Sequence, residues 1–284
     1  MTLGVLGLAC ARVGLPVDGV VLLRAGENEL YRVRPGVVAR VSRPGLFAVA
    51  VKEVAVSRWL TDQRLPVVES LADPVEVADR AVTFWRELPA HDYGTTEQVA
   101  GVLRQLHTLP APTWLPALDP LTGLRDRLQQ ATTLAAPDRR WLLDHVDRLT
   151  TAYADLPAGL PDGPLHGDAW AGNIVSTAAG PVILDLERFA VGPPEWDLVS
   201  TAVDHFSFGA VDARAWRTFC DSYGLDVTAS PRFETLRDIR ELRKVTFAAQ
   251  LAATDPAIHA ELLHRLACVR GGTGPRPWRW RGVP

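Results

Sequence analysis

The sequence reads Leu165-His166-Gly167-Asp168-Ala169-Trp170-Ala171-Gly172-Asn173, and soon afterwards Val182-Ile183-Leu184-Asp185-Leu186-Glu187. Within this stretch Asn173 follows Asp168 by five residues, and Asp185 follows Asn173 by twelve, near the end of an apolar run. Carboxylate and amide oxygens are the ligands that Mg²⁺ takes in proteins. Phosphoryl transfer uses one carboxylate to orient a hydroxyl, and an amide and a second carboxylate to hold metal against nucleotide phosphates. The pattern therefore predicts a site for phosphoryl transfer.

A further motif, Gly192-Pro193-Pro194-Glu195-Trp196-Asp197-Leu198, follows this stretch. Together, in this order and spacing, the motifs resemble those of the aminoglycoside phosphotransferase and choline kinase family, distant relatives of the protein kinases. The resemblance implies that Asp168 is the catalytic base and that His166 belongs to the same catalytic loop as its structural support. It also implies that Asp197 is a buried anchor.

The resemblance implies a metal site and a fold as well. Asn173 and Asp185 become the metal ligands. The fold class is α+β, a two-lobed protein-kinase-like fold with a small antiparallel-sheet N-lobe and a larger, mainly helical C-lobe. We expect the N-lobe, a nucleotide-binding sheet plus one helix, to span residues 1–88. Residues 89–284 then carry the catalytic loop, the metal site and a helical acceptor-binding region.

Short apolar runs broken by Gly and Pro between Val20 and Val41 predict antiparallel strands and tight turns. Residues 26–29 separate two of these runs, so a hairpin is expected there. In the family this hairpin covers the nucleotide phosphates, which implies Gly26 and Asn28 as nucleotide-binding positions. The turn holds one glycine only, which departs from a glycine-rich loop.

An arginine, Arg40, interrupts the apolar strand at residues 37–41. In the family a Lys or Arg here reaches the nucleotide phosphates and pairs with a Glu on the next helix. Residues 47–63 are expected to form that helix, so Arg40 and Glu53 are the candidate pair. The competitor for the phosphate-binding role is Lys52, which should face elsewhere because it adjoins Glu53 on a helix. By the same resemblance, adenine would bind main-chain groups around Glu87 and Leu88, where a strand at residues 81–88 enters a linker.

In the C-terminal part, residues 236–251 predict a helix that places Leu236, Ile239, Leu242 and Val245 toward the core. The other face carries Arg237, Arg240, Glu241, Arg243 and Lys244, and is expected to be a solvated surface. If this face instead lines the cleft, an acceptor with a carboxylate or phosphate is favoured over a polyamine. Asp204, Glu234, Asp238 and Glu241 would suit a cationic amino sugar, and the alternatives stay open.

The 284-residue chain is 47% hydrophobic and 22% charged, with a net charge of -3, as expected for a globular protein of one large domain or two lobes. Because no long Lys or Arg run occurs, nucleic acid is not an expected partner. Neither Lys52 nor Lys244 follows a glycine, which excludes a P-loop. No apolar run is long enough for a membrane span, and three widely spaced cysteines indicate reduced thiols in a cytoplasmic protein.

We therefore expect an ATP-dependent and Mg²⁺-dependent O-phosphotransferase, with GTP as the other nucleotide to consider. Its partner is a small-molecule hydroxyl acceptor, with no membrane partner, and the protein is expected to be a monomer or weak dimer. An aminoglycoside or related antibiotic is the leading acceptor, and an amino alcohol, amino acid or sugar is the alternative. A nucleotide-binding pseudokinase is the alternative of another class. A metallophosphoesterase is disfavoured because its His-rich two-metal cage typically includes Asp-x-His, which is absent.

Overall fold

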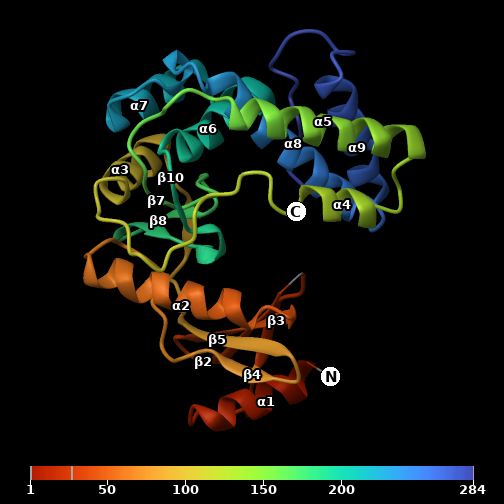
Figure 1. The fold of residues 1–284 in the computed structure, drawn as a ribbon. Coiled ribbons are helices and arrows are strands. Elements are labelled where there is room, and N and C mark those ends of the chain that lie inside the picture. Colours follow the sequence, from red (N-terminus) through yellow and green to blue (C-terminus); the bar gives the residue numbers. More distant parts are fainter. Residues whose placement is uncertain (1, 27, 284) are drawn as a thin grey trace. The chain divides into compact units, whose positions relative to one another are not determined.

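The computed structural model describes residues 2–26 and 28–283. Glu27, in the predicted hairpin turn, lies outside the described residues. The chain forms two compact units, one made of Met1–Leu109 with Ala171–Phe189 and the other of Pro110–Trp170 with Ala190–Pro284. Figure 1 shows the first unit's sheet and the second unit's helices, which confirms the predicted α+β class. The expected lobe boundary after residue 88 stays a prediction.

The first unit is built on a five-stranded antiparallel sheet of order β1-β2-β3-β5-β4. Its strands are β1 (Val21–Arg24), β2 (Glu29–Arg34), β3 (Val37–Pro44), β4 (Val75–Val77) and β5 (Arg80–Arg86). The strands expected at residues 20–41 and 81–88 are thus confirmed, with ends shifted by a few residues. Side chains alternate between the two faces of a strand, so Ala39 and Val41, which are buried on one face, leave Arg40 on the other.

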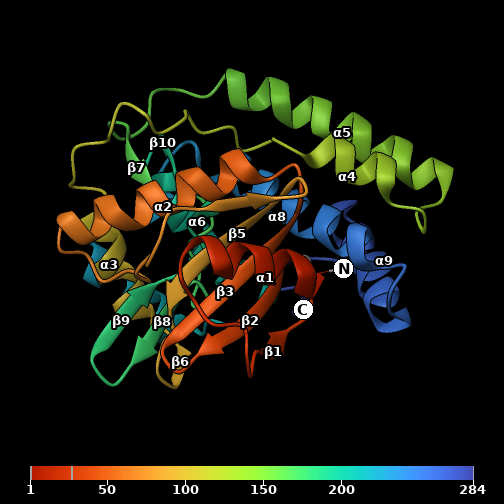
Figure 2. The same ribbon diagram turned by 90° about the horizontal axis from the view of Figure 1, so that it is seen from below.

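Two helices cover the two faces of this sheet (Figure 2). The first, α1 (Thr2–Arg12), packs Leu6, Ala9 and Cys10 into the same apolar cluster as Ala39 and Phe84. The expected helix at residues 47–63 is α2 (Phe47–Asp62), which contacts β5 and reaches Arg40 from the other face. The sequence analysis did not predict α1, because its apolar residues are not gathered on one helical face.

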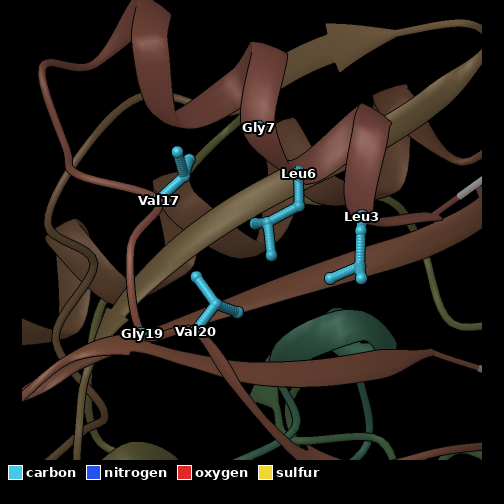
Figure 3. A pocket seen from close by; sticks show the side chains of 6 residues that line it. All are labelled: Leu3, Leu6, Gly7, Val17, Gly19 and Val20. Carbon is cyan, nitrogen blue, oxygen red and sulfur yellow. The ribbon is translucent and has the colours of Figure 1, made fainter.

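An apolar cavity of about 290 Å³ lies beside α1 (Figure 3). It is lined from α1 by Leu3, Leu6 and Gly7, and from the connection to β1 by Val17, Gly19 and Val20. Since α1 packs on the sheet face opposite Arg40, this cavity lies on the other side of the sheet from the Arg40 side chain.

The rest of the first unit is α3 (Thr96–Leu106), a three-stranded sheet and the 3₁₀ turn η1 (Leu186–Arg188). A capping box starts α3, since the Thr95 side chain accepts from the Gln98 amide and the Gln98 side chain accepts from the Thr95 amide. The sheet pairs β8 (Ile174–Thr177) with both β6 (His91–Tyr93) and β9 (Gly180–Ile183). This β8–β9 hairpin separates Asn173 from Asp185.

The second unit is mainly helical and is organised around α8 (Phe233–Leu251), which contacts α4 (Leu124–Gln130), α5 (Ala136–Ala154), α6 (Glu195–Val203) and α9 (Pro256–Val269). Its predicted core positions Leu236, Ile239, Leu242 and Val245 are fully buried. The short strands β7 (Gly163–Leu165) and β10 (Ala190–Gly192) pair antiparallel. The remaining elements are a π-helical turn, η2 (Asp204–Phe208), followed by α7 (Ala213–Tyr223) and η3 (Val227–Ala229).

The tail returns to the second unit, where Trp280 is buried with 4% of its surface exposed. Cys10, Cys220 and Cys268 are free thiols. Among the described residues, no helix has both the length and the apolar character required to cross a membrane.

Candidate active site

The predicted catalytic loop begins where β7 ends, and its backbone is held by Asp197. The Asp197 carboxylate, fully buried at the start of α6, accepts the main-chain amides of His166 at 2.8 Å and Gly167 at 2.9 Å. Gly167 has a φ of +82°, a conformation that side chains disfavour. The loop turn therefore depends on glycine at this position and on a buried carboxylate from α6.

His166 is fully buried directly before this turn. Its Nδ1 accepts the main-chain amide of Asp168 at 3.3 Å. The ring thus satisfies a backbone donor of the loop, which is the geometry of a structural support. A hydrogen bond between Nδ1 and an amide also places the ring proton on Nε2 when the ring is neutral.

The predicted base, Asp168, is the one carboxylate within residues 165–173, and 35% of its side chain is accessible. Its Oδ1 accepts from the Arg240 guanidinium at 3.0 Å. Burial acts to raise the pKa of Asp168, but Lys244, Arg240, Arg243 and His166 outweigh it and lower the pKa to about 2. Asp168 is therefore ionised at neutral pH.

The basic face of α8 is not a solvated surface, so that expectation is wrong. Arg240 and Glu241 are 1% and 2% exposed, and Arg243 and Lys244 are half-buried. Glu241 bonds to Ser207 at 2.5 Å and to Arg276 at 2.7 Å. Long cationic side chains can bury their stems and carry their charge to a polar site. Arg240 is buried in this way, and its guanidinium brings a positive charge to Asp168.

A second carboxylate lies near Asp168 at the start of the π-helical turn η2. Burial raises the pKa of Asp204 to about 6, although Lys244 opposes this, and the negative charge of Asp168 raises it further. The Lys244 ammonium lies 5.9 Å from the centroid of the Trp170 ring, two residues beyond Asp168. Asp168 therefore has a second acid, Asp204, and a lysine, Lys244, near it in the second unit. Single π-helical turns are frequent at functional sites.

The predicted metal ligands lie in the first unit, on either side of the β8–β9 hairpin. Asn173 is 8% exposed, and its main-chain carbonyl accepts the Leu184 amide at 2.8 Å. This bond brings the chain back to Asn173 one residue before Asp185. Asp185 is exposed and has a φ of +52°, a strained conformation that is uncommon for residues other than glycine.

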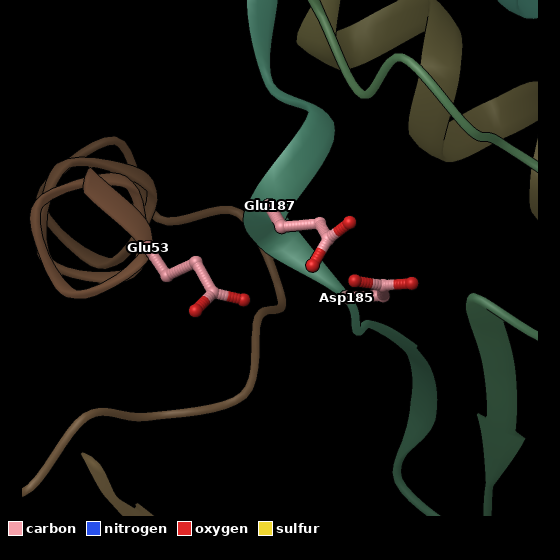
Figure 4. Close-up of side chains that lie close together, drawn as sticks. All are labelled: Glu53, Asp185 and Glu187. Atoms are coloured by element: carbon pink, nitrogen blue, oxygen red, sulfur yellow. The ribbon is translucent and has the colours of Figure 1, made fainter. Parts of the chain in front are cut away.

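Three carboxylates converge at this point: Glu53 from α2, and Asp185 and Glu187 from the loop and η1 (Figure 4). Their ligand oxygens lie within 4.8 Å of one another. Such a concentration of negative charge is unfavourable without cations, and oxygen ligands at this spacing suit a hard divalent cation. The cluster includes the predicted ligand Asp185, and adds Glu187, which the sequence analysis noted only as part of a motif.

Arg40 on β3 forms an ion pair with Glu53 on α2. Burial raises the pKa of Glu53 to about 7 against the opposing effect of Arg40, and the charges of Asp185 and Glu187 add to the rise. The candidate pair is thus formed, and one of its members also faces the carboxylate cluster. Its nucleotide-binding role stays a prediction.

Lys52 reaches the turn that follows Asp185, whereas Arg40 pairs with Glu53. Its ammonium donates to the main-chain carbonyls of Glu187 at 2.7 Å and Phe189 at 3.2 Å. It therefore ties α2 to the turn that follows Asp185. The sequence analysis missed this role because main-chain acceptors leave no signal in a sequence.

The other predicted nucleotide-binding positions lie around the sheet. Gly26 and Asn28 flank the undescribed Glu27, and the Asn28 side-chain oxygen is buried without a hydrogen-bond partner among the described residues. Glu87 accepts from Arg32 at 2.7 Å, and its main-chain amide donates to the Gly36 carbonyl at 3.0 Å. The residue after it, Leu88, is half-buried and lies beyond the end of β5.

Known proteins resemble this chain in family and in fold. Residues 20–235 match the family model described as the phosphotransferase enzyme family. A choline/ethanolamine kinase family protein from Mesorhizobium loti has 20% identity and a TM-score of 0.64, with 94% of this chain and 92% of that chain covered. The aminoglycoside phosphotransferase APH(3'')-Id from Streptomyces rimosus has 20% identity and a TM-score of 0.63, with 84% and 96% covered.

A third solved structure is the amicoumacin kinase hAmiN in complex with AMP-PNP, Ca²⁺ and Ami. Its identity is 13% and its TM-score 0.71, with 94% of this chain and 93% of that chain covered. The fold and the family match together define a small-molecule kinase with the fold of the protein-kinase-like enzymes. The chain belongs to the phosphotransferase enzyme family, as the sequence motifs predicted.

Proposed function

We propose that this protein transfers the γ-phosphoryl group of ATP to a hydroxyl of a small molecule, with Asp168 as the base. The observation that carries the proposal is the state of Asp168: a carboxylate that is kept ionised, is partly exposed and stands on a loop anchored by Asp197. Family membership supports the reaction class. GTP remains the alternative nucleotide.

In the proposed reaction the acceptor oxygen bonds to the γ-phosphorus, and the bond from that phosphorus to the β–γ bridging oxygen breaks. The nucleoside diphosphate leaves, and the acceptor's proton passes to Asp168. A carboxylate with a pKa of about 2 is a weak base, so its main contribution is to orient the hydroxyl for in-line attack. Phosphoryl transfer tolerates this, because its transition state is loose and little proton removal is needed early.

Arg40, oriented by Glu53, would bind the nucleotide phosphates, and main-chain groups at Glu87 and Leu88 would bind the base. The hairpin at Gly26 and Asn28 would lie over the phosphates. The side-chain oxygen of Asn28, which is buried without a hydrogen-bond partner among the described residues, is consistent with a ligand at this turn. The guanidinium of Arg40 can bind two phosphate oxygens at once, which a lysine cannot do.

Mg²⁺ is the proposed metal, and the residues present fit a hard divalent cation. Asn173 and Asp185 would be its ligands, and Glu187 is the further candidate because its carboxylate lies in the same cluster as Asp185. When bound, the metal would neutralise charge on the nucleotide phosphates. Lys52 fixes the main chain at Glu187 and so keeps this carboxylate near Asp185.

For the acceptor we propose an aminoglycoside or related antibiotic. The neighbours include an amicoumacin kinase and an aminoglycoside phosphotransferase, which supports this choice by similarity of fold. Of the four acids expected to suit an amino sugar, Glu241 and Asp238 bind arginines within the protein. Asp204 is the acid that lies near Asp168, so it is the proposed partner of an acceptor ammonium group.

A metabolite acceptor with a carboxylate, such as an amino acid, is the second candidate, and Lys244 favours it. In the part of the chain that the structure describes, neither Lys244 nor Asp204 forms a hydrogen bond or ion pair through its charged group. The Lys244 ammonium and the Asp204 carboxylate, both near Asp168, would complement the two opposite charges of a zwitterionic acceptor. Replacing Lys244 with Met should raise KM for a carboxylate-bearing acceptor only, whereas Asp204→Asn should raise KM for a cationic one.

The testing experiment measures nucleotide consumption with Mg²⁺ across a panel of aminoglycosides, peptide antibiotics, amino alcohols, amino acids and sugars. Turnover stimulated by one class and abolished in Asp168→Asn would support the proposal, and mass spectrometry of the product would identify the phosphorylated hydroxyl. ATP binding without any turnover would favour a pseudokinase. Absence of nucleotide binding would contradict the assigned nucleotide residues.

A further inference from the structure

Arg240 is a cation buried in the second unit, with 1% of its surface exposed. Burying a guanidinium is costly unless it is paired with hydrogen-bond acceptors. Its Nη1 donates to the Gly167 carbonyl at 3.2 Å and to Asp168 Oδ1 at 3.0 Å, and its Nη2 donates to the Trp196 carbonyl at 3.0 Å. The side chain therefore joins α8 to the predicted catalytic loop and to the start of α6.

The orientation of this guanidinium is fixed by an aromatic ring. Its central carbon lies 4.0 Å from the centroid of the Trp196 ring, and the Trp196 indole nitrogen donates to the same Gly167 carbonyl at 3.0 Å. Gly167 thus receives two donors on its carbonyl, while its amide donates to Asp197. Gly167 is thus held at both its amide and its carbonyl. Among Asp197, Trp196 and Arg240, it is Arg240 that also contacts the Asp168 carboxylate.

We propose that Arg240 is a positioning residue for phosphoryl transfer, which holds the Asp168 carboxylate and the Gly167 carbonyl in one geometry. The inference rests on the proposed role of Asp168. A misplacement of about 1 Å at a reacting group can cost on the order of 10² in rate. In this role Arg240 acts through Asp168 and Gly167, and it does not need to contact the acceptor.

The contact pattern requires arginine rather than lysine. Two nitrogens of a planar fork reach three acceptors on two segments of the chain while the central carbon lies over an indole ring. An ammonium is a single point donor and does not stack in this way. Arg240→Lys therefore keeps the positive charge but loses the geometry, and Arg240→Met loses both while keeping a side chain of similar length.

A matched control is available in Arg265 on α9, which is also 1% exposed in the same unit. Arg265 bonds to Glu261 at 2.8 Å and to the Lys244 carbonyl at 2.8 Å. Its replacement by Met removes a buried arginine and its hydrogen bonds without touching the predicted loop. Loss of stability is expected in both Arg240 and Arg265 variants, so stability alone does not distinguish them.

The first readout is turnover of the folded variants, with an acceptor that the wild type phosphorylates. We expect Arg240→Met to lower kcat on the order of 10²-fold, and Arg240→Lys on the order of tenfold, with KM for the nucleotide changed less than about threefold. Arg265→Met should keep kcat within about threefold. If Arg240→Met and Arg265→Met lower kcat equally, the proposal is wrong.

The second readout needs no catalytic activity. A double-mutant cycle in urea unfolding combines Arg240→Lys with Asp168→Asn, and a parallel cycle combines Arg265→Lys with Asp168→Asn. The first cycle should show coupling on the order of tenfold in the unfolding equilibrium constant, and the second less than about twofold. Absence of coupling in the first cycle overturns the proposal. A wild type that phosphorylates nothing would instead refute the proposed function, whatever the cycle shows.

Discussion

One carboxylate, that of Asp197, binds the main-chain amides of both His166 and Gly167, at 2.8 and 2.9 Å, and so fixes the turn that presents Asp168. These residues are about 30 positions apart in the sequence, and Asp197 is fully buried. A buried acid that serves two backbone donors in a loop with a left-handed glycine supports the loop's conformation rather than its chemistry.

Asp197→Asn should lower the free energy of unfolding by about 2–3 kcal/mol. Asparagine offers one acceptor oxygen, so one buried amide loses its partner and faces an NH₂ group. Urea denaturation measures the change. The exposed Asp162→Asn is the control and should shift stability by less than about 0.5 kcal/mol. Equal stability of the two variants would contradict the anchoring role.

Asp168→Asn should lower kcat by about 10² to 10⁴, the range expected for loss of a general base. The affinity for nucleotide should change little, because the predicted nucleotide-binding side chains are elsewhere in the chain. Steady-state kinetics and a nucleotide-binding titration separate these effects. Full activity of the variant would show that Asp168 is not the base.

Arg40→Ala should raise KM for the nucleotide by about 10- to 100-fold, since a charge-assisted contact to phosphate is lost and Glu53 is left buried without its partner. Arg40→Lys should recover only part of this loss, because the fork that pairs with Glu53 is absent. Arg34→Ala, at an exposed position on β2, is the control. A KM unchanged by Arg40→Ala would remove this residue from the nucleotide site.

Asp204 should make stability depend on pH. Burial raises its pKa from 3.8 to about 6, so the folded state binds this proton more tightly than the unfolded state. The stabilisation that Asp204 gives the folded state is therefore fully present below pH 3.8, and it is lost as pH rises through 6. Between pH 4 and pH 7 the free energy of unfolding of Asp204→Asn should rise, relative to that of the wild type, by about 1–2 kcal/mol. Urea unfolding of both proteins at each pH measures this, and a difference independent of pH would contradict it.

Local patterns accounted for much of the fold. Short apolar runs broken by Gly and Pro predicted β2 and β3, and the apolar spacing predicted the core face of α8. These features depend on residues within a few positions of one another. The motif at residues 165–187 led to the family in the same way, because its members are close in sequence and their spacing can be read directly.

The helix α1 and the environment of α8 could not be predicted in this way. An apolar segment without a clear periodic face, such as residues 2–12, fits a helix or a strand equally well before its packing partner is known. The polar face of α8 was expected to be solvated because surface helices usually show such a face. Arg240 and Glu241 show that charged residues of such a face can also be buried when they bond to a counter-charge.

The sequence by itself determined the family, the order of the site motifs and the residues that could act as base, metal ligands and phosphate partner. Only the tertiary structure decided that Lys52 supports the turn after Asp185, that Glu187 joins Asp185 and Glu53, and that Arg240 reaches Asp168. The reason is physical. The contacts of Lys52 and Arg240 join segments that are 70 or more residues apart in the sequence, and several of their acceptors are backbone carbonyls. Such acceptors are chemically identical at every position, so only the packing of helices and strands selects among them.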